Sequence, residues 1–371
     1  MASNGALFIF VLSFLICSCR FNPKIETKES TLGFVAKNGM VSCAHPLATE
    51  VGLEILRKGG NAFDAAAAVH FVLAVVYPGA GNIGGGGFAL LRTSEGTISS
   101  LDFRERAPLL AHRDMYLDSS GNPISMASRL GHLSAGVPGS VDGILLMHDS
   151  LGSLTRSAIL KPAIRLANRG FTLFKSDIGI LKRYQANFEL VNSSPIPFVR
   201  SVWNVGDTIK LPDLAKTLEQ ISDSGRSGFY SGIVAESIIK ECQEGNGLIS
   251  YEDLRKYRSQ WRQPIHGTYR DYEIYCMGPP SSGGVALMQL LKGAEQRDIS
   301  HHGHNSTSNL HYIAELEKRV YADRASHLGD PDFYDVPQKQ LLDPVYLKER
   351  YSDIKVDKAT PSDQIRKGFV D

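Results

Sequence analysis

Apolar side chains recur at helical spacing along much of the chain, and residues Leu47–Lys58 are the first clear case. Val51 and Ile55 continue the apolar stripe that begins at the first residue of this stretch. Gly59 and Gly60 follow directly, and glycine commonly ends a helix because it adopts backbone angles that other residues avoid. The pattern therefore predicts an amphipathic helix over 47–58.

A second helix is predicted immediately afterwards. Asn61 can cap it, and the carboxylate of Asp64 lies in the first turn, where it favours the free amides and the positive end of the helix dipole. The body, Ala65–Val76, is apolar nearly all round, which is typical of a buried helix. Pro78 ends it.

The remaining pattern predicts a mixture of helices and β-hairpins. Helices are expected over residues 139–150, 157–168, 176–189, 211–222, 231–244, 251–260, 285–295 and 309–328. Hairpins are expected over 33–44, with a turn at Asn38-Gly39, over 88–104, and over 264–277. From Pro331 the sequence turns polar and irregular, and neither a repeat nor a linker divides the chain.

A glycine-rich loop lies between the second helix and the second hairpin. Gly79, Gly81 and Gly84 match the G-x-G-x-x-G pattern of nucleotide-binding loops, but those loops join a strand to the start of a helix. This loop instead follows a helix and enters a strand. We interpret the run Gly84–Gly87 as a place where the backbone closely approaches another segment or a substrate.

Composition excludes several classes of protein. The chain has 371 residues, of which 43% are hydrophobic and 21% charged, so it can bury a large core and is not generally disordered. Lys and Arg number 40 against 39 Asp and Glu, which gives a net charge of +1. No overall field therefore favours nucleic acid as a partner.

The N-terminus is interpreted as a targeting segment. Ala6–Ile16 is an uncharged apolar run that is too short for a permanent membrane span and typical of a secretory signal. It ends at Cys17-Ser18-Cys19, which resembles a bacterial lipoprotein processing box with Cys19 as the lipid-bearing residue. Residues 1–19 are thus expected to be a signal peptide with a lipobox, 20–32 a polar leader, and 33–371 the folded region. The expected location is the periplasm or a membrane anchored through Cys19.

Cysteine and histidine provide little evidence for a metal or a disulfide framework. Cys43, Cys242 and Cys276 are widely spaced and include no C-x-x-C pair, which favours buried inert thiols. The run His301-His302-Gly303-His304 and nearby His311 suggest a metal site, but closely adjacent histidines in a polar loop seldom point at one ion. We expect a solvated loop here, and no metal or cofactor.

Two polar groups could carry chemistry. Ser281 and Ser282 are either nucleophiles or helix-capping residues, and capping is favoured because no base lies nearby in the sequence. At the end of a predicted strand, alternation places Asp102, Arg104 and Arg106 on one side and Glu105 on the other. Such a guanidinium could bind a substrate carboxylate with two parallel hydrogen bonds, or it could belong to a surface salt-bridge cluster.

Motifs in a fixed order then identify a family. They are Gly39-Met40-Val41, Ala44-His45-Pro46-Leu47-Ala48, Gly59 to Ala66, Asn82 to Phe88, Asp102-Phe103-Arg104-Glu105 with Ala107-Pro108, Gly136-Val137-Pro138-Gly139, Pro279 to Gly284, Ala322-Asp323-Arg324, and Gly329-Asp330-Pro331-Asp332. Together, over roughly Gly33 to Gly368, they resemble the large-subunit portion of the γ-glutamyltranspeptidases, also called glutathione hydrolases.

The resemblance implies an α+β fold, the αββα sandwich of the N-terminal-nucleophile hydrolases. In this family one precursor cuts itself into a large and a small subunit. The chain matches the large-subunit part, which is incomplete without the small subunit from the same precursor as its partner.

The resemblance also implies an activity. The family cleaves the γ-glutamyl amide of glutathione and other γ-glutamyl compounds, and transfers the γ-glutamyl group to water or to amino-acid and dipeptide acceptors. The nucleophile is the N-terminal Thr of the small subunit, and its own α-amine is the natural base. No catalytic residue is therefore expected in this chain, the Thr is expected beyond Asp371, and the chain alone is expected to be inactive.

One binding residue carries over. Arg104 matches the family arginine that binds the α-carboxylate of the γ-glutamyl group, whereas the resemblance assigns no role to Glu105 or Arg106. Ser281 and Ser282 precede a helix of the large-subunit part and are not the small-subunit serine pair. Two alternatives stay open: a β-lactam acylase of the same fold that acts on glutaryl amides, and a non-catalytic exported lipoprotein that serves as a binding module.

Overall fold

The computed structural model describes residues 33, 35–192 and 194–369. The described residues from Val41 onward form one compact unit, and those before Val41 belong to a separate unit. The expected signal peptide and Cys19 lie outside the described residues. Among the helices that are described, none combines the length and the apolar character that crossing a membrane would require.

The hairpin expected over 33–44 is wrong for the described residues of that stretch, which contain no strand. Val41 and Cys43 instead pack as partly buried side chains against the main core. An added Cβ at Gly52 would lie 2.8 Å from a methyl of Val41, so the two segments are in close contact. An isolated two-stranded hairpin is only marginally stable, and packing against the helices replaces it here.

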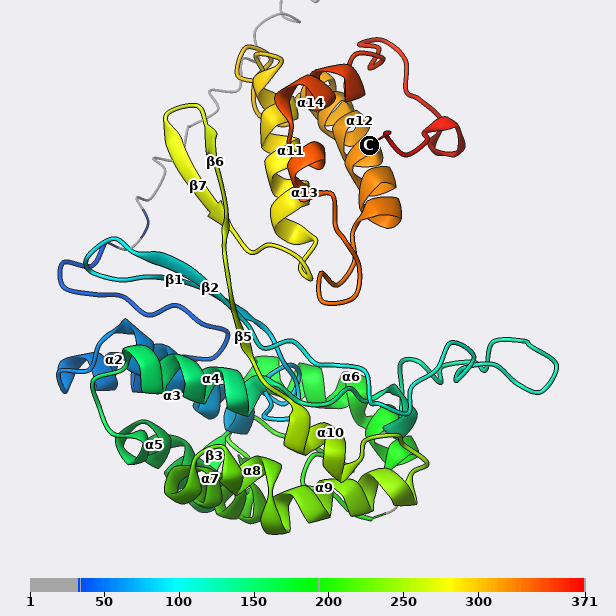
Figure 1. The fold of residues 1–371 in the computed structure, drawn as a ribbon. Helices are drawn as coiled ribbons and strands as arrows, with labels where there is room; N and C mark the ends of the chain where they lie inside the picture. Colours follow the sequence, from blue (N-terminus) through cyan, green and yellow to red (C-terminus); the bar gives the residue numbers. More distant parts are fainter. Residues whose placement is uncertain (1–32, 34, 193, 370–371) are drawn as a thin grey trace, which may run out of the picture. The chain divides into compact units, whose positions relative to one another are not determined.

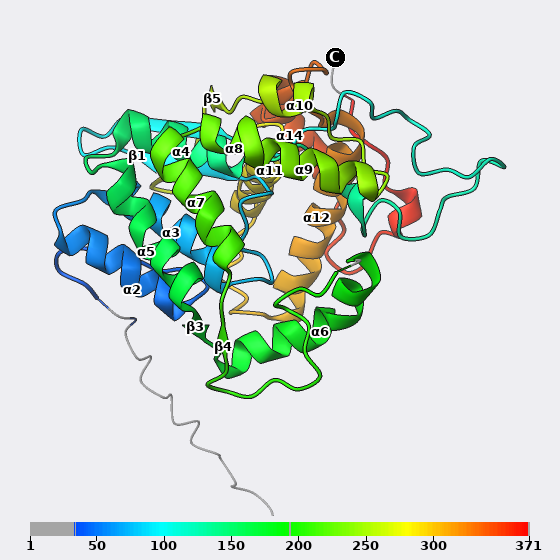
Figure 2. The same cartoon turned by 90° about the horizontal axis from the view of Figure 1, so that it is seen from below.

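Most helices of the compact unit belong to its first 220 described residues (Figure 1). They are α2 (Pro46–Arg57), α3 (Ala62–Val76), α4 (Ser140–Leu151), α5 (Arg156–Arg169), α6 (Lys175–Val191), α7 (Pro212–Ser224), α8 (Ser227–Tyr230), α9 (Gly232–Glu244) and α10 (Tyr251–Lys256). Helix α3 contacts α2, α4 and α5, and α5 contacts α7. Figure 2 shows α2, α3, α5 and α7 following one another side by side. The periodicity predicted these helices to within a few residues, apart from the end of α10 and from the single turn of α8, which it did not predict.

Helix α3 begins as its sequence predicts. The Asn61 side chain accepts hydrogen bonds from the backbone N–H groups of Phe63 and Asp64, at 2.9 and 3.0 Å. The Asp64 carboxylate in turn accepts from the Asn61 N–H at 2.8 Å, which completes a reciprocal cap. Asp64 is fully buried and also accepts from the N–H groups of Ser153 and Leu154. One carboxylate therefore fixes both the start of α3 and the loop that follows α4.

The largest sheet has three antiparallel strands in the order β1 (Phe88–Arg92), β2 (Ile98–Asp102) and β5 (Gln260–Arg262). Ala89 lies opposite Leu101, and Leu101 lies opposite Trp261. Helix α4 packs against β2, and Leu101 is completely buried in the main core. The opposite face carries Leu90, which is 45% exposed.

Strand β5 corrects the helix expected over 251–260. Helix α10 ends at Lys256, and Tyr257 leaves the helix with φ −55° and ψ 134°. Residues 260–262 then pair with β2, so that Gln260 lies opposite Asp102. The helical period was correct only for the first turns, because backbone hydrogen bonds to a distant strand determine the conformation of the last residues.

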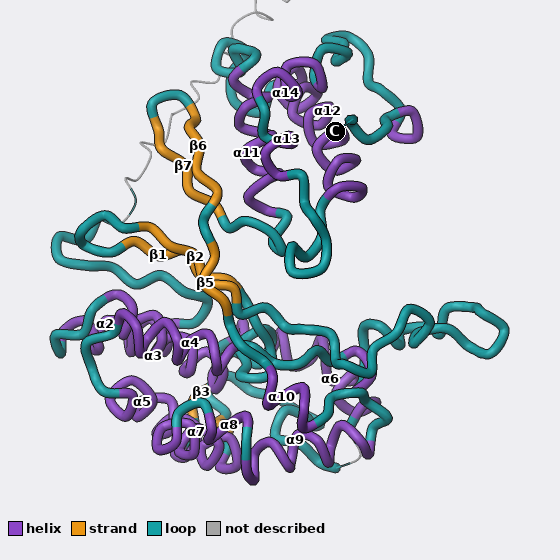
Figure 3. The backbone as a smooth tube through the Cα atoms, viewed as in Figure 1, coloured by secondary structure: helices purple, strands orange, loops and turns teal. Residues whose placement is uncertain are grey.

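The remaining strands form two small antiparallel ribbons, and the last helices follow them (Figure 3). Strand β3 (Phe171–Thr172) pairs with β4 (Thr208–Ile209), and β6 (Ile265–Tyr269) pairs with β7 (Tyr272–Cys276). Then come α11 (Gly283–Glu295), α12 (Thr307–His327), α13 (Gln338–Leu341) and α14 (Pro344–Arg350). Two smaller apolar clusters join these elements, one built on α12 and the other between the β6–β7 ribbon and α11.

The region after Pro331 is more ordered than its polar composition indicates. Asp343 caps α14 by accepting hydrogen bonds from the N–H groups of Val345 and Tyr346, and Pro344 occupies the first helical position. Leu341 and Leu347 are each 1% exposed. Helices α13 and α14 are too short to show a recognisable period, so burial rather than pattern identifies them.

Candidate substrate-binding site

Arg104 lies just beyond the end of β2, with its backbone held on both sides. Its N–H donates to Oδ1 of Asp102 at 3.1 Å, and its carbonyl accepts from the Tyr257 hydroxyl at 2.8 Å. The side chain is much less constrained. Nη1 lies 3.5 Å from the carbonyl oxygen of Pro280, and the guanidinium carbon lies 5.9 Å from the centre of the Phe88 ring. The backbone is thus fixed while the exposed guanidinium is largely free to bind a ligand.

A small cleft surrounds this guanidinium. It is lined by Asp102, Arg104, Glu105, Arg106, Tyr257, Arg258, Arg262, Pro280 and Asp330. The expected alternation is confirmed in part, because Asp102, Arg104 and Arg106 share the cleft. Glu105 lines it too, since β2 ends at Asp102 and strict alternation ends with it.

The other arginines of the cleft are already engaged. Arg262 donates from Nη1 and Nη2 to the two carboxylate oxygens of Asp332, at 3.0 and 3.1 Å, and from Nε to Asp102 at 2.8 Å. Arg106 donates to Oδ2 of Asp332 at 3.1 Å. Arg258 donates from Nη1 to the backbone carbonyls of Arg255 and Tyr257.

Arg104 differs from Arg106 and Arg262 because it forms no ion pair within the described residues. Arg258 forms none there either, but its Nη1 donates to two backbone carbonyls, whereas the guanidinium of Arg104 has only the 3.5 Å contact with Pro280. The hydrogen bonds from Arg262 lower the pKa of the Asp332 carboxyl, so Asp332 stays ionised at neutral pH and remains paired. A surface salt-bridge cluster therefore does form here, through Arg106 and Arg262. Arg104 stands outside it, with an exposed guanidinium whose only hydrogen bond within the described residues is a 3.5 Å contact with the Pro280 carbonyl.

The glycine run Gly84–Gly87 packs directly behind the segment that bears Arg104. An added Cβ at Gly86 would lie 2.5 Å from the Phe103 carbonyl oxygen and 2.6 Å from the Glu105 nitrogen. Gly87 and Phe103 exchange two backbone hydrogen bonds, at 3.2 and 3.0 Å. The interpretation of this run as a close backbone approach is confirmed, and the segment it approaches carries the candidate site.

A second set of contacts fixes Tyr257, whose hydroxyl binds the Arg104 carbonyl. Asp142, at the start of α4, accepts from Nε of Arg226 at 2.5 Å and from the Ser259 N–H at 2.7 Å. Arg226 also donates to the carbonyl of Tyr257 at 2.7 Å. Tyr257 stacks on Tyr230 with ring centres 6.0 Å apart. These contacts hold Tyr257, which in turn holds the Arg104 backbone.

Sequence reasoning missed three residues of this site. Tyr257 and Arg262 fell at the end of the expected helix and after it, so no pattern related them to Arg104. Asp332 belongs to the motif Gly329 to Asp332, which matched the family but did not indicate what Asp332 does. Only folding brings Asp332 to Arg106, which is 226 residues away in the sequence.

The serine pair has a structural role at the start of α11. Ser282 occupies the N-cap position without capping through its side chain, and its hydroxyl accepts from Nε of Arg324 at 2.9 Å. The Ser281 hydroxyl accepts from the Gly283 N–H at 3.2 Å. The helix-start interpretation is confirmed, with the hydrogen bond made by Ser281 rather than by the N-cap residue.

The histidine and cysteine candidates do not come together. His311 lies 2.8 Å from the Lys355 carbonyl oxygen, and His302 lies 3.5 Å from Arg297. The described residues contain no group of three or more His, Cys, Asp or Glu side chains placed to hold an ion. Cys242 and Cys276 are buried and Cys43 is half-buried, and all three are free thiols.

Comparison with known proteins identifies the family. The family model described as Gamma-glutamyltranspeptidase matches residues 48–368 of this chain. The chain belongs to the γ-glutamyltranspeptidase family. The resemblance seen in the motifs is thereby confirmed, and with it the assignment to a family of enzymes.

The curated precursor and the solved chains match this chain over different fractions of their own length. The glutathione hydrolase proenzyme of Escherichia coli is 44% identical over 338 residues, which are 90% of this chain but 58% of that protein. The crystal structure of Helicobacter pylori gamma-glutamyltranspeptidase matches with a TM-score of 0.88 and 43% identity, over 90% of this chain and 97% of the solved chain. Gamma-glutamyltranspeptidase from Pseudomonas nitroreducens complexed with L-DON matches with a TM-score of 0.84 and 40% identity, over 90% and 99%.

The fold is that of the N-terminal-nucleophile hydrolases, as the motifs led us to expect. Within the described residues, it comprises helical layers on one face of the β1–β2–β5 sheet and the ribbons and helices that follow. The chain spans 58% of the length of the curated E. coli relative.

Proposed function

We propose that this chain is the large-subunit part of a glutathione hydrolase and γ-glutamyltransferase. In this proposal Arg104 binds the α-carboxylate of the γ-glutamyl group. The small subunit of the same precursor supplies a Thr whose hydroxyl attacks the γ-carbonyl and whose α-amine accepts the proton. The amine leaves, and water or an amino-acid or dipeptide acceptor then releases the γ-glutamyl group from the acyl-Thr enzyme.

The unpaired guanidinium of Arg104 is the observation that carries this proposal. A charge-assisted, two-pronged hydrogen bond to a carboxylate is the strongest contact that such a group makes, and a protein seldom leaves it unused in a cleft. Glu105 lines the same cleft, and its carboxylate forms no ion pair within the described residues. A free cation beside a free anion suits a zwitterionic amino-acid group.

The need for a second subunit is supported by the lengths of the relatives. This chain matches nearly all of the solved H. pylori chain but 58% of the curated E. coli proenzyme. The exposed Leu90 on the outer face of the sheet also offers apolar surface for a further layer. Both features fit a protein in which another segment completes the sandwich and carries the nucleophile.

The test uses the chain completed by its small subunit, with a γ-glutamyl anilide as substrate. Arg104→Ala should lower kcat/KM by roughly 10 to 100-fold, mainly through KM, because it removes one charge-assisted pair worth about 1.5–3 kcal/mol. Arg104→Lys should recover only part of this, since a lysine cannot form the two parallel hydrogen bonds. Arg113→Ala is the matched control, because Arg113 is 97% exposed and, in the described part of the chain, its only ion pair is a 4.0 Å contact with Asp114. An unchanged KM in Arg104→Ala would remove Arg104 from the site.

A glutaryl-type β-lactam acylase is the second candidate, because Arg104 would bind a glutaryl carboxylate equally well. The two acyl groups differ only in the α-amine. Parallel kinetics with γ-glutamyl and glutaryl anilides separate the candidates, and preference for the glutaryl compound would overturn the glutathione assignment. Binding of γ-glutamyl compounds without turnover would favour a non-catalytic exported lipoprotein.

We also propose that the protein is exported and anchored through a lipid on Cys19. The apolar run Ala6–Ile16 followed by the cysteine supports this. The intact mass of the mature N-terminus tests it. Cleavage before Cys19 with an added lipid mass is expected, and a mature chain that retains residues 1–18 would contradict the proposal.

A further inference from the structure

We infer that Asp332 is a specificity-determining residue: by neutralising Arg106 and Arg262 it prevents these two arginines from binding a second anionic group next to the carboxylate held by Arg104. The inference rests on the proposed role of Arg104 as the carboxylate-binding group. It adds a reason why two of the four arginines that line the cleft, Arg106 and Arg262, are not offered to a ligand. Arg258 is held separately, by the backbone carbonyls of Arg255 and Tyr257.

The geometry gives Asp332 two cationic partners. Its two oxygens accept from Nη1 and Nη2 of Arg262, and Oδ2 also accepts from Arg106 at 3.1 Å. Gln260 adds a fourth hydrogen bond at 3.3 Å. The Asp332 side chain is 26% exposed, so this carboxylate lies at the wall of the cleft rather than in the core.

The two arginines depend on Asp332 to different extents. Arg262 is also held by Asp102 through Nε, at 2.8 Å, and is 15% exposed. Arg106 is 39% exposed, and its only ion pair within the described residues is with Asp332. Its guanidinium carbon otherwise lies 6.0 Å from the Tyr257 ring. If Asp332 were neutral, Arg106 would be the cation released into the cleft.

The consequence is a change in what the cleft binds. With Asp332 ionised, a second anionic group on a ligand would have to displace a carboxylate that already has four hydrogen bonds, and it would meet the like charge of Asp332. A ligand with one carboxylate can bind Arg104 without disturbing these pairs. With Asp332 replaced by Asn, Arg104 and Arg106 would both be available, and a compact dianion would gain a new binding site.

Asp330 provides a matched control in the same cleft. It lies two residues earlier, lines the cleft, and accepts from the Asp332 N–H at 3.0 Å through Oδ1. It forms no ion pair within the described residues. Asp330→Asn therefore removes the same charge from the same place without releasing an arginine.

The experiment uses inorganic sulfate as the probe, as a competitive inhibitor of γ-glutamyl anilide hydrolysis by the completed two-subunit protein. We expect Asp332→Asn to lower the inhibition constant for sulfate about tenfold, which is the effect of one new charge-assisted hydrogen bond. Asp330→Asn should change it less than about threefold, by the general field alone. Adding Arg106→Ala to Asp332→Asn should restore the original value. Equal gains in both aspartate variants, or no gain in Asp332→Asn, would overturn the inference.

A second measurement separates this inference from the proposed function. The sulfate-dependent rise in Tm of each variant reports binding without any turnover. If the protein fails to cleave γ-glutamyl anilides, the proposed function fails, and the Tm difference between Asp332→Asn and Asp330→Asn still tests Asp332. A lower Tm for Asp332→Asn with no added response to sulfate would make Asp332 purely structural and would overturn the inference.

Discussion

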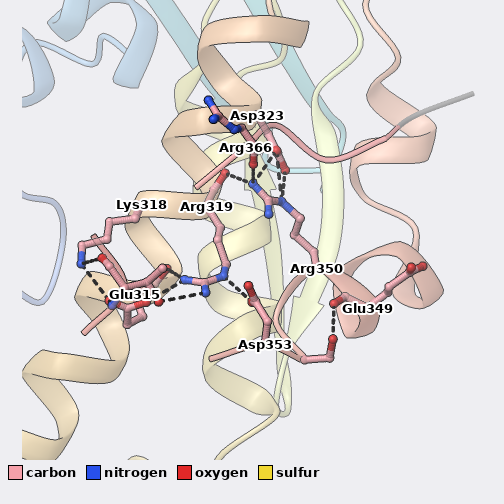
Figure 4. A network of polar contacts seen from close by, with 10 residues as sticks. Glu315, Lys318, Arg319, Asp323, Glu349, Arg350, Asp353 and Arg366 are labelled. Carbon is pink, nitrogen blue, oxygen red and sulfur yellow. Dashed lines mark hydrogen bonds and ion pairs between the residues drawn. The ribbon is translucent and has the colours of Figure 1, made fainter. Parts of the chain in front are cut away.

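Two groups of arginines and carboxylates, one along α12 and the other in the cleft beyond β2, use the same residue types to different ends. Figure 4 shows the contacts of the first group. Its central residue, Arg319, is completely buried. It donates to Oε2 of Glu315 and to Oδ1 of Asp353, each at 2.8 Å, and to the Glu315 carbonyl at 3.0 Å. Lys318 adds a hydrogen bond to Glu315 at 2.8 Å.

The other half of the α12 group is equally complete. Asp323 accepts from Nε of Arg350 at 3.1 Å, from the Tyr346 hydroxyl at 2.6 Å, and from the Gly368 N–H at 2.7 Å. Arg350 in turn donates to the Arg366 carbonyl at 2.7 Å. These contacts fasten residues 360–368 onto α12 and α14.

The difference between the groups lies in what remains unpaired. Along α12 the buried charges are matched by hydrogen bonds within the chain, so the group closes on itself and supports the structure. In the cleft, Arg106 and Arg262 are matched by Asp332, but Arg104 and Glu105 are not. Pairing, rather than residue type or charge, therefore separates the group along α12, which closes on itself, from the cleft, which leaves Arg104 and Glu105 without a charged partner among the described residues.

The largest effect is expected when a charged partner is removed from the group along α12. Arg319→Met removes one of the two cations that pair with the buried Glu315 carboxylate, and we expect the free energy of unfolding to fall by about 3–5 kcal/mol. Urea unfolding measures it. Arg255→Met is the control, since Arg255 is 66% exposed and lies 3.9 Å from Glu252, so its loss should cost under about 0.5 kcal/mol. Equal losses would show that burial does not distinguish the pairs.

Lowering the pH tests the same contrast, because it protonates the Glu315 carboxylate. Burial alone would raise the pKa of this carboxyl, but hydrogen bonds from Lys318, Arg319 and Thr360 outweigh it and lower the pKa to about 2. Because the folded-state pKa is depressed, the stabilisation is complete above the ordinary value of 4.5 and is lost as the pH falls from 4.5 towards 2. The shift corresponds to roughly 3 kcal/mol.

Glu315→Gln tests this contribution. It should be less stable than the parent at pH 7, and the gap in the free energy of unfolding should narrow as the pH is lowered below 4.5. Unfolding curves collected from pH 7 to pH 3 measure the gap. A gap that stays constant across this range would contradict the role assigned to the Glu315 charge.

In the cleft, a substitution in the glycine run can displace the backbone that carries Arg104 while leaving the Arg104 side chain and its charge unchanged. Gly86→Ala places a Cβ 2.5 Å from the Phe103 carbonyl oxygen, and we expect a loss of about 1–3 kcal/mol in stability and a higher KM for a γ-glutamyl anilide. Gly84→Ala is its control, because nothing lies within 4 Å of the added Cβ. If both variants behave alike, the glycine run does not position the site.

The smallest expected change is in stability when Arg104 itself is removed. Since its guanidinium is exposed and forms no ion pair within the described residues, Arg104→Ala should alter the free energy of unfolding by less than about 0.5 kcal/mol. The same variant should lose binding of the γ-glutamyl group. A loss of more than about 1 kcal/mol in urea unfolding would make Arg104 a structural residue and remove the contrast.

The sequence predicted the parts of the site that depend on local rules. The cap at Asn61, the period of α3, and the position of Arg104 at the end of a strand all follow from residues within a few positions of one another. The hairpin expected over 33–44 and the helix expected through Gln260 failed because distant segments determine the conformation there. In each case long-range packing outweighed a weak local preference.

Sequence alone determined the family, most helices, and the position of Arg104 at the end of a strand, because motifs and periodicity are properties of neighbouring residues. It did not determine which arginines would be free. Asp332 reaches Arg262 across 70 residues and Arg106 across 226, so the pairing exists only once the chain has folded. Whether a charge is available to a ligand depends on the partners that folding brings within about 3 Å, and tertiary structure alone decides that distance.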